Sequence, residues 1–271
     1  MIANARMYAP NDVIAAAWRR LFDWVARDAG VPLQYVAHPA PLSLAELWQR
    51  DDLGCALMCG FPWATWRGPT ERPVPLAAPV PAPQLFDDQP SYWTDIVVRA
   101  DSDFTTADDL RGARFAYTID DSQSGYQAPR RFFAERARAA GGRLFSATVG
   151  PLVTPRRVVD AIISGEADAG PLDAWWHALL RRHEPHIAAR LRVITRTAPA
   201  PIPLVVCAAV VPENQRRRLA AALEKVGDAE DVASERDVLL LRRFSPPDLR
   251  SYQALIDNAR EADALGYDRL Q

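Results

Sequence analysis

Five segments near the N-terminus alternate between two patterns: IANARMY (residues 2–8), VIAAAWRRLFDWVARD (13–28), LQYVA (33–37), LAELWQ (44–49) and CALMC (55–59). The second has its large apolar residues at helical spacing, follows the capping pair Asn11-Asp12 and ends before Gly30. The first, third and fifth are short apolar runs typical of buried strands. This βαβαβ order favours a largely parallel sheet with helices on both faces, so we predict an α/β fold.

A second α/β run fills the middle of the chain. It begins with a strand at residues 92–99 and ends with a strand at 191–195, and a further strand follows at 204–210 before two final helices. We predict two interleaved lobes: residues 1–92 and 202–271 form lobe 1, and residues 93–201 form lobe 2. The strands at about 92–99 and 204–210 would act as a hinge between them. Two sequential lobes would fit the same periodicity.

Residues 69–90 are rich in proline. They also carry four apolar residues, Val74, Leu76, Val80 and Leu85. We interpret the segment as an edge strand with an irregular extension, because proline is tolerated at sheet edges. A low-complexity linker is the alternative.

Length and composition limit the possible functions. The chain has 271 residues, enough for two domains, with 49% hydrophobic and 24% charged residues. The 32 basic and 34 acidic residues nearly balance, which argues against a broad nucleic-acid-binding surface. Lys225 is the only lysine, so no P-loop or Schiff-base lysine occurs elsewhere. No run approaches the ~18 apolar residues that would predict membrane insertion.

Cysteine and histidine usage does not predict a metal site or any other cofactor. The cysteines Cys55, Cys59 and Cys207 are odd in number, and we expect buried thiols, with a metal or redox pair at the first two as the alternative. The histidines are interpreted as surface residues or residues at the end of a helix: His38, His177, His183 and His186.

The strongest candidate site is the stretch DDSQSGY at residues 120–126, which follows a predicted strand and opens a predicted helix. Free backbone N–H groups and the helix dipole favour an anion at such a position. The hydroxyls of Ser122 and Ser124 could donate to one tetrahedral oxyanion, and Gly125 would permit close backbone approach. The alternative is a simple helix cap.

Two further strand ends carry candidate residues. After the strand at 55–59, Gly60 would let the chain turn and the rings of Phe61 and Trp63 could wall a pocket, with core packing as the alternative. After the strand at 167–170, Asp173 could accept a hydrogen bond from a ligand, with a plain N-cap as the alternative. No GxGxxG motif, no His-Glu-x-x-His motif and no nucleophile elbow occurs.

Several of these segments, in this order, resemble one known family. The loop at 121–126 followed by Pro129 resembles a Ser-x-Ser-Gly-Tyr-x-x-Pro anion loop, and residues 91–94 (SYWT) resemble a Tyr-Trp-Ser strand. Residues 59–63 (CGFPW) resemble a Gly-Pro turn with phenylalanine inserted. Together they resemble the phosphonate/phosphate/phosphite substrate-binding proteins of ABC transporters (the PhnD type). The resemblance implies the two-lobed type II periplasmic-binding-protein fold, a Venus flytrap whose lobes are mainly parallel sheets flanked by helices.

The resemblance also implies roles for individual residues. Ser122 and Ser124 would donate to the phosphoryl oxygens, and Gln123 would occupy the middle place, where the family often has threonine or serine. Tyr92 would contact the ligand from the hinge, and Asp173 would face the part of the ligand beyond the anion. The remaining implied ligand-binding residues are Gly125 and Tyr126 in the loop, and Tyr8, Gly60, Phe61 and Trp63 on the opposite wall.

The implied function is capture of a small phosphonate-like or phosphate-like anion by lobe closure, with an ABC permease as partner and no cofactor or nucleic acid. Such proteins are most often monomers. One alternative is a cytoplasmic enzyme of the menaquinone-pathway type on the same fold, with Asp173 or Asp120 as acid or base. Another is a ligand-sensing module. The residues after Met1 do not resemble a signal peptide, which predicts a cytoplasmic location, or a periplasmic one if the sequence was trimmed.

Overall fold

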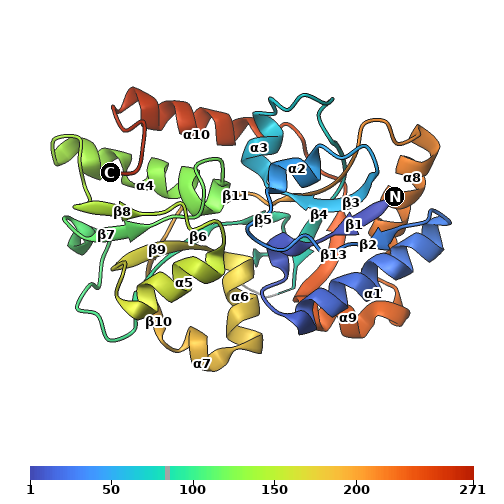
Figure 1. Cartoon of the computed structure of the whole chain (residues 1–271), viewed down its shortest axis with the longest axis horizontal. Coiled ribbons are helices and arrows are strands. Elements are labelled where there is room, and N and C mark those ends of the chain that lie inside the picture. The colour runs from blue at the N-terminus through green and yellow to red at the C-terminus, as the bar shows by residue number, and fades with distance from the viewer. Residues whose placement is uncertain (83–85) are drawn as a thin grey trace. The chain divides into compact units, whose positions relative to one another are not determined.

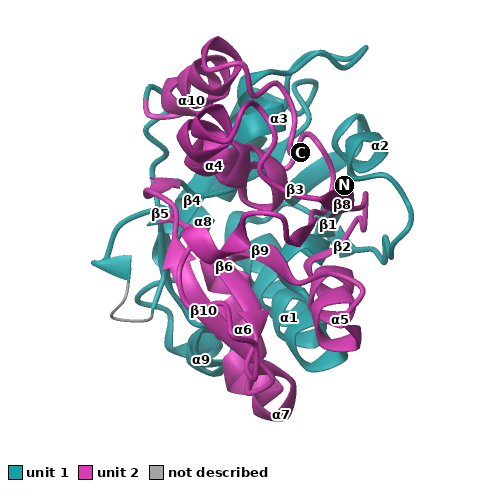
Figure 2. Cartoon of the chain, turned by 90° about the vertical axis from the view of Figure 1, so that its left-hand side faces the viewer, with its two compact units in different colours: residues 1–91, 201–250 teal, residues 92–200, 251–271 magenta. Residues whose placement is uncertain are grey.

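The computed structural model describes residues 1–82 and 86–271, so the strand residue predicted at Leu85 lies outside the described residues. The chain divides into two compact units (Figures 1 and 2). Unit 1 contains residues 1–91 and 201–250, and unit 2 contains residues 92–200 and 251–271. No described helix is long and apolar enough to cross a membrane.

Unit 1 is built on a sheet of six strands: β1 (Ile2–Asn4), β2 (Gln34–Tyr35), β3 (Leu53–Met58), β4 (Val74–Pro81), β12 (Leu204–Cys207) and β13 (Leu241–Ser245). Their order is β13-β4-β12-β3-β1-β2. Strand β1 pairs in parallel with β2 and β3, as the βαβ pattern predicts. Strand β12 runs antiparallel to β3 and β4, and β13 runs antiparallel to β4.

The proline-rich strand β4 lies inside this sheet, so the prediction of an edge strand was wrong. It pairs with β12 on one side and with β13 on the other. Both ladders contain a register shift, and such irregularities are where a sheet tolerates prolines, which lack an N–H donor.

The helices of unit 1 pack around this sheet: α1 (Asp12–Ala29), α2 (Leu44–Trp48), α3 (Gly60–Ala64), α8 (Glu213–Lys225) and α9 (Ala233–Leu239). Helix α1 begins at a capping Asn11, whose side chain accepts a hydrogen bond from the Ile14 N–H at 3.1 Å, and it ends at Gly30 in the left-handed conformation. The strand predicted over residues 2–8 ends at Asn4, and Arg6–Tyr8 forms a 3₁₀ turn instead.

Unit 2 is built on a five-stranded sheet: β6 (Thr94–Arg99), β7 (Arg114–Ala116), β8 (Ala147–Val149), β9 (Ala169–Asp173) and β10 (Leu191–Arg196). The order is β10-β6-β9-β7-β8. Strand β7 pairs in parallel with β8 and β9, whereas β6 runs antiparallel to β9 and β10. The carboxyl ends of β7, β8 and β9 therefore meet at one edge of the sheet, and β6 begins at that same edge.

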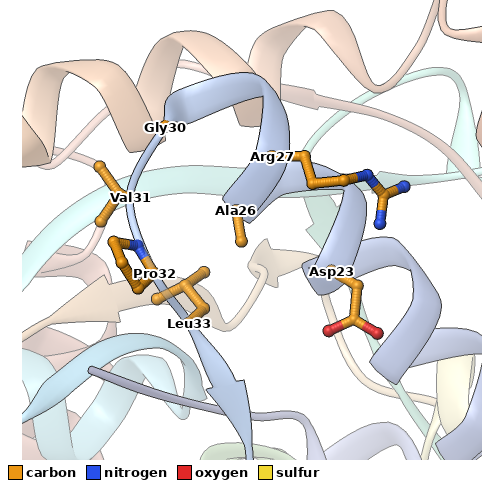
Figure 3. Close-up of a pocket in the computed structure, with 7 residues that line it drawn as sticks. All are labelled: Asp23, Ala26, Arg27, Gly30, Val31, Pro32 and Leu33. Atoms are coloured by element: carbon orange, nitrogen blue, oxygen red, sulfur yellow. The ribbon is translucent and has the colours of Figure 1, made fainter.

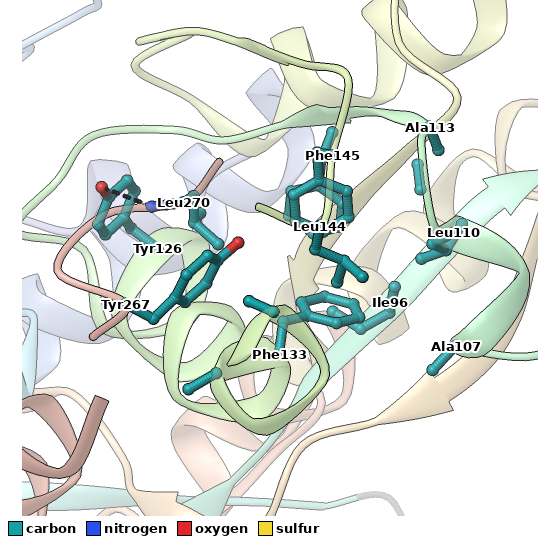
Figure 4. Close-up of a cluster of buried hydrophobic side chains, with 14 of the residues drawn as sticks. Ile96, Ala107, Leu110, Ala113, Tyr126, Phe133, Leu144, Phe145, Tyr267 and Leu270 are labelled. Atoms are coloured by element: carbon teal, nitrogen blue, oxygen red, sulfur yellow. Dashed lines mark hydrogen bonds between the residues drawn. The ribbon is translucent and has the colours of Figure 1, made fainter. Parts of the chain in front are cut away.

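Helices cover the sheet of unit 2: α4 (Ala128–Ala139), α5 (Pro155–Ser164), α6 (Ala174–His183), α7 (Pro185–Ala188) and α10 (Gln253–Ala264). Figure 1 shows α4 and α10 on one side of the sheet and α5 on the other. An aromatic cluster lies under α4, where Phe115 and Phe145 stack at a centroid distance of 4.6 Å. Phe133 packs edge-on against both rings, and Figure 4 shows Phe133 beside Phe145.

The C-terminal residues 251–271 belong to unit 2, which corrects the prediction that residues 202–271 all lie in lobe 1. Tyr267 and Leu270 are buried in the same hydrophobic cluster as Phe133 (Figure 4). The guanidinium of Arg130 donates to the Asp263 carboxylate at 2.5 Å and to the Tyr267 carbonyl at 3.0 Å. Apolar burial and this buried arginine thus hold the C-terminal segment against α4.

The predicted hinge strands do not connect the units. The chain passes between units at residues 91–92, 200–201 and 250–251. The first two points fall in the short strands β5 (Ser91–Tyr92) and β11 (Ala200–Pro201), which pair with each other. The strands predicted at 92–99 and 204–210 instead belong to the separate main sheets of unit 2 and unit 1.

The Arg130 contacts predict a large loss of stability in Arg130→Met. The side chain is 4% exposed and also donates to the Gln127 side chain and the Ala259 carbonyl. Its removal leaves the buried Tyr267 carbonyl and several partly buried acceptors without their donor, so we expect the free energy of unfolding to fall by about 3 kcal/mol in urea denaturation.

Arg131→Met is the matched control. Arg131 lies next in the same helix and also pairs with a carboxylate of α10, that of Glu261, but at the surface. We expect it to cost less than about 1 kcal/mol. Equal losses in the two variants would contradict the structural role assigned to Arg130.

Candidate functional site

The predicted anion loop, residues 122–126, lies at the carboxyl edge of the unit 2 sheet. The chain leaves β7, turns through residues 117–122 and enters a π-helical turn, Gln123–Gln127, that continues directly into α4. π-Helical turns occur frequently at functional sites. The predicted strand–loop–helix arrangement is therefore present, with a wider first turn than the α-helix that was predicted.

Ser122 and Gly125 determine the conformation of the anion loop. The Ser122 hydroxyl oxygen accepts a hydrogen bond from the Gly125 N–H at 3.0 Å, which is the helix cap considered as the alternative. Because the hydroxyl acts here as an acceptor, its own proton stays available for donation. A Cβ atom on Gly125 would lie 1.9 Å from the Thr118 Oγ1 atom, so the loop can approach the end of β7 only with glycine at this position.

The loop is fixed to the beginning of β6 through Thr94. The Thr94 hydroxyl donates to the Ser124 carbonyl at 3.1 Å, and the Thr94 N–H donates to the Thr197 hydroxyl at 3.0 Å. Thr94 also lies opposite Asp173 in the ladder between β6 and β9. The structure thus brings Ser124 and Asp173 to the same edge through one intervening residue, and Tyr92 lies two positions before it.

Asp173 forms the N-cap of α6, the alternative that its sequence position allowed. Its Oδ1 atom accepts hydrogen bonds from the Trp175 and Trp176 N–H groups at 2.9 and 3.0 Å. The residue is 7% exposed. Its position at the sheet edge agrees with a ligand-facing role, and its capping bonds fix the carboxylate there.

The side chains of Gln123 and Tyr126 point into unit 2. Gln123 is buried, and the Tyr126 hydroxyl accepts a hydrogen bond from the Leu270 N–H at 3.1 Å (Figure 4). The Tyr126 ring also packs edge-on against Tyr117. The side chain of Tyr126 therefore connects the anion loop to the C-terminal segment. Only the backbone of Tyr126 forms part of the loop itself.

The other predicted ligand residues lie in unit 1. Tyr8 and Gly60 follow the parallel strands β1 and β3, so they lie at one edge of that sheet, with Phe61 beside Gly60. Trp63 is buried, donates from its indole nitrogen to the Pro73 carbonyl at 3.0 Å and packs beneath the Arg72 guanidinium at 4.5 Å. Trp63 is thus a core residue, and the alternative interpretation holds for it.

A buried ionic cluster in unit 2 was not predicted. His177 was expected near the surface, but it is 1% exposed, and its Nδ1 atom lies 2.7 Å from the Asp95 carboxylate. The other oxygen of that carboxylate accepts hydrogen bonds from Trp93 at 3.0 Å and Arg196 at 3.2 Å. The apolar run AWWHALL around His177 is the sequence signal that could have indicated burial.

The pKa values of this pair shift in directions set by burial and hydrogen bonding. Burial lowers the pKa of His177, and the hydrogen bond to Asp95 opposes that shift only in part. Burial alone would raise the pKa of Asp95, but the hydrogen bonds from His177 and Trp93 and the charge of Arg196 bring it below its usual value. At neutral pH the arrangement is a neutral imidazole beside a carboxylate.

The cysteines are buried thiols, as expected. Burial raises the pKa of Cys207 to about 12 and that of Cys55 further, with the neighbouring Cys207 adding to the shift at Cys55. Within residues 1–82 and 86–271, no group of three or more His, Cys, Asp or Glu side chains is arranged to hold a metal ion.

A surface pocket of unit 1 contains none of the predicted ligand residues. It lies where α1 ends, and Figure 3 shows Asp23 and Arg27 on the helix with Val31, Pro32 and Leu33 on the following segment. None of the residues that line this pocket belongs to a sequence motif of hydroxyl or backbone donors. The carboxyl edge of the unit 2 sheet is therefore the better candidate for a binding site.

A hydroxyl-rich loop at a helix N-terminus, on the carboxyl edge of an α/β sheet, is a position where proteins of this architecture commonly bind small anions. The sequence matches the model of a family described as ABC transporter, phosphonate, periplasmic substrate-binding protein over residues 7–252. The chain belongs to this family, as the resemblance predicted. The family consists of substrate-binding proteins and not of enzymes.

Solved structures confirm the predicted type II periplasmic-binding-protein fold. PhnD1 from Prochlorococcus marinus, in complex with methylphosphonate, superposes with a TM-score of 0.80 at 16% identity, covering 97% of this chain and 98% of that chain. A binding protein component of an ABC phosphonate transporter from Pseudomonas aeruginosa (PA3383) gives a TM-score of 0.74 at 16% identity, covering 98% and 96%. No curated protein matches the sequence significantly.

The buried pair predicts that stability decreases with acid. The pKa of His177 is lower in the folded chain than the ordinary value of 6.5 that applies in the unfolded chain. Below pH 6.5 the unfolded chain therefore binds more protons, and the free energy of unfolding should fall as the pH falls. The lowered pKa of Asp95 acts in the same direction below pH 3.8. Urea denaturation between pH 8 and pH 5 measures the histidine effect.

The variant His177→Gln keeps a donor for Asp95 and removes the titration, so its stability should change less over this range. His186→Gln, at an exposed position, is the control and should keep the wild-type dependence. An unchanged dependence in His177→Gln would contradict the assignment.

Proposed function

We propose that this chain binds a small phosphonate-like or phosphate-like anion at the carboxyl edge of unit 2 and delivers it to an ABC permease. The anion loop would hold the phosphoryl oxygens through the Ser122 and Ser124 hydroxyls and the backbone of the first helical turn. The observation that carries the proposal is the Ser122 cap. The Ser122 hydroxyl accepts a hydrogen bond from the Gly125 N–H at 3.0 Å, so it is held at the start of a helix and can still donate its own proton to a ligand.

Neutral donors are sufficient for such a ligand. A hydrogen bond to a charged group contributes about 1.5–3 kcal/mol net. The positive end of the helix dipole adds to this without any cationic side chain. Family membership and the methylphosphonate bound by PhnD1 support phosphonates as the ligand class.

Asp173 would face the substituent of the ligand in this proposal. Its capping bonds from the Trp175 and Trp176 N–H groups fix the carboxylate in place, which suits recognition of a polar or cationic substituent. The roles of Tyr8, Gly60 and Phe61 stay predictions.

The double variant Ser122→Ala/Ser124→Ala tests the site. Loss of two charge-assisted hydrogen bonds should weaken binding of methylphosphonate or inorganic phosphate by at least about 100-fold in isothermal titration calorimetry.

Ser102→Ala/Ser164→Ala is the matched control in unit 2 and should keep wild-type affinity, since the Ser102 and Ser164 hydroxyls bond only to nearby backbone in the described contacts. Wild-type affinity in the 122/124 variant would refute the site. If the wild type binds neither methylphosphonate nor inorganic phosphate, the proposed ligand class is refuted.

A further inference from the structure

The hydroxyl of Thr118 is a buried polar group that the described structure leaves unsatisfied. Thr118 is 4% exposed, and its Oγ1 atom has no hydrogen-bond partner among the described residues. Buried hydroxyls in native proteins nearly always have a partner, so an exception calls for an explanation, and binding of a ligand is one such explanation.

This hydroxyl lies against the anion loop. The Thr118 Oγ1 atom and the Ser122 Oγ atom lie 1.9 and 2.9 Å from the point that a Cβ of Gly125 would occupy. The two hydroxyls therefore both lie close to the space that a side chain at position 125 would fill. Gly125 thus allows Thr118 and Ser122 to come near one another at the start of the helix.

The backbone around Thr118 fixes its position. Its N–H donates to the Gly125 carbonyl at 3.3 Å, and its carbonyl accepts from the Val153 N–H at 3.0 Å. Val153 follows β8 and has a φ of +70°, which a β-branched residue adopts only when its surroundings enforce it. Thr118 is therefore held between the loops that follow β7 and β8, at the edge where ligands bind in open α/β sheets.

We infer that Thr118 donates its hydroxyl proton to the bound anion and supplies, beside Ser122 and Ser124, the third side-chain hydroxyl of the site. The inference rests on the proposed function and adds a residue to it. Gln123 occupies the place in the loop where the family often has a hydroxyl residue, and its side chain is buried. Thr118, four residues before Ser122, offers a replacement from the preceding strand end.

The contribution of the hydroxyl can be separated from that of the methyl group by two variants that both lack the methyl group. Thr118→Ser keeps the hydroxyl and Thr118→Ala removes it. Calorimetry with methylphosphonate and with inorganic phosphate should give Thr118→Ser an affinity within about threefold of the wild type. Thr118→Ala should bind at least about tenfold more weakly than Thr118→Ser. Equal affinities in these two variants would overturn the inference.

Thr118→Val distinguishes a ligand contact from a structural role. Replacing an unsatisfied buried hydroxyl by a methyl group of the same shape should leave the melting temperature of the ligand-free protein unchanged or raise it. If Thr118 donates to the ligand, Thr118→Val should bind the anion at least about tenfold more weakly than the wild type although it is equally stable. Wild-type affinity in Thr118→Val would overturn the inference.

The two proposals fail in different ways. If the wild type binds methylphosphonate or phosphate and Ser122→Ala/Ser124→Ala loses that binding while Thr118→Val keeps it, only the role of Thr118 is refuted. If the wild type binds neither anion, the proposed function is refuted, and this inference with it.

Discussion

The absence of a side chain at Gly125 is the constraint on which the candidate site depends. With a Cβ only 1.9 Å from Thr118 Oγ1, any other residue would push the loop away from the end of β7. The Ser122 cap and the hydrogen bond from Thr94 to the Ser124 carbonyl both need the loop in its present position. A single backbone position thus brings the strand end, the helix start and the hydroxyl groups together.

Contacts between the C-terminal segment and the first turns of α4 also hold the anion loop in place. Arg130 lies in the first turn of α4 and donates hydrogen bonds to both the Gln127 side chain and the Asp263 carboxylate. The Tyr126 hydroxyl bonds to the Leu270 N–H. The first turns of the helix that carries the anion loop are therefore packed against the last residues of the chain, and burial of Tyr267 and Leu270 contributes to holding the loop in place.

Local sequence patterns predicted much of the fold but not its long-range assignments. Helix α1 and strand β3 were predicted because their apolar residues follow clear periods. Strand β13 was not, since its sequence LRRFS has only two apolar residues. The unit to which residues 251–271 belong depends on contacts with Arg130 and the aromatic cluster, about 130 positions earlier, and no local pattern records these.

For the site, the sequence located the loop but could not assign the side chains within it. Ser122 and Asp173 were each predicted as a ligand residue or as a cap, and the structure shows both acting as caps. Trp63 and Tyr126 were predicted as site residues, but their side chains pack in the interior. The sequence could not show this, because it does not record the direction in which an aromatic side chain points from the first turn of a helix. Thr118 was missed because a hydroxyl residue at the end of a strand is unremarkable until its neighbours are known.

The use of arginine in unit 2 explains why a site of neutral donors fits this chain. Arginine supplies nearly all of its positive charge, and in unit 2 the structure pairs Arg114 with Asp168, Arg130 with Asp263 and Arg156 with Glu184. These cations stabilise the fold and are neutralised by their partners. In the proposed site, recognition of the anion would fall to hydroxyls and a helix N-terminus, which offer directional bonds rather than net charge. A site of this kind would select its ligand by the geometry of the ligand oxygens, which suits a tetrahedral phosphonyl group. It would also bind without a strong ion pair that could slow release to a transporter.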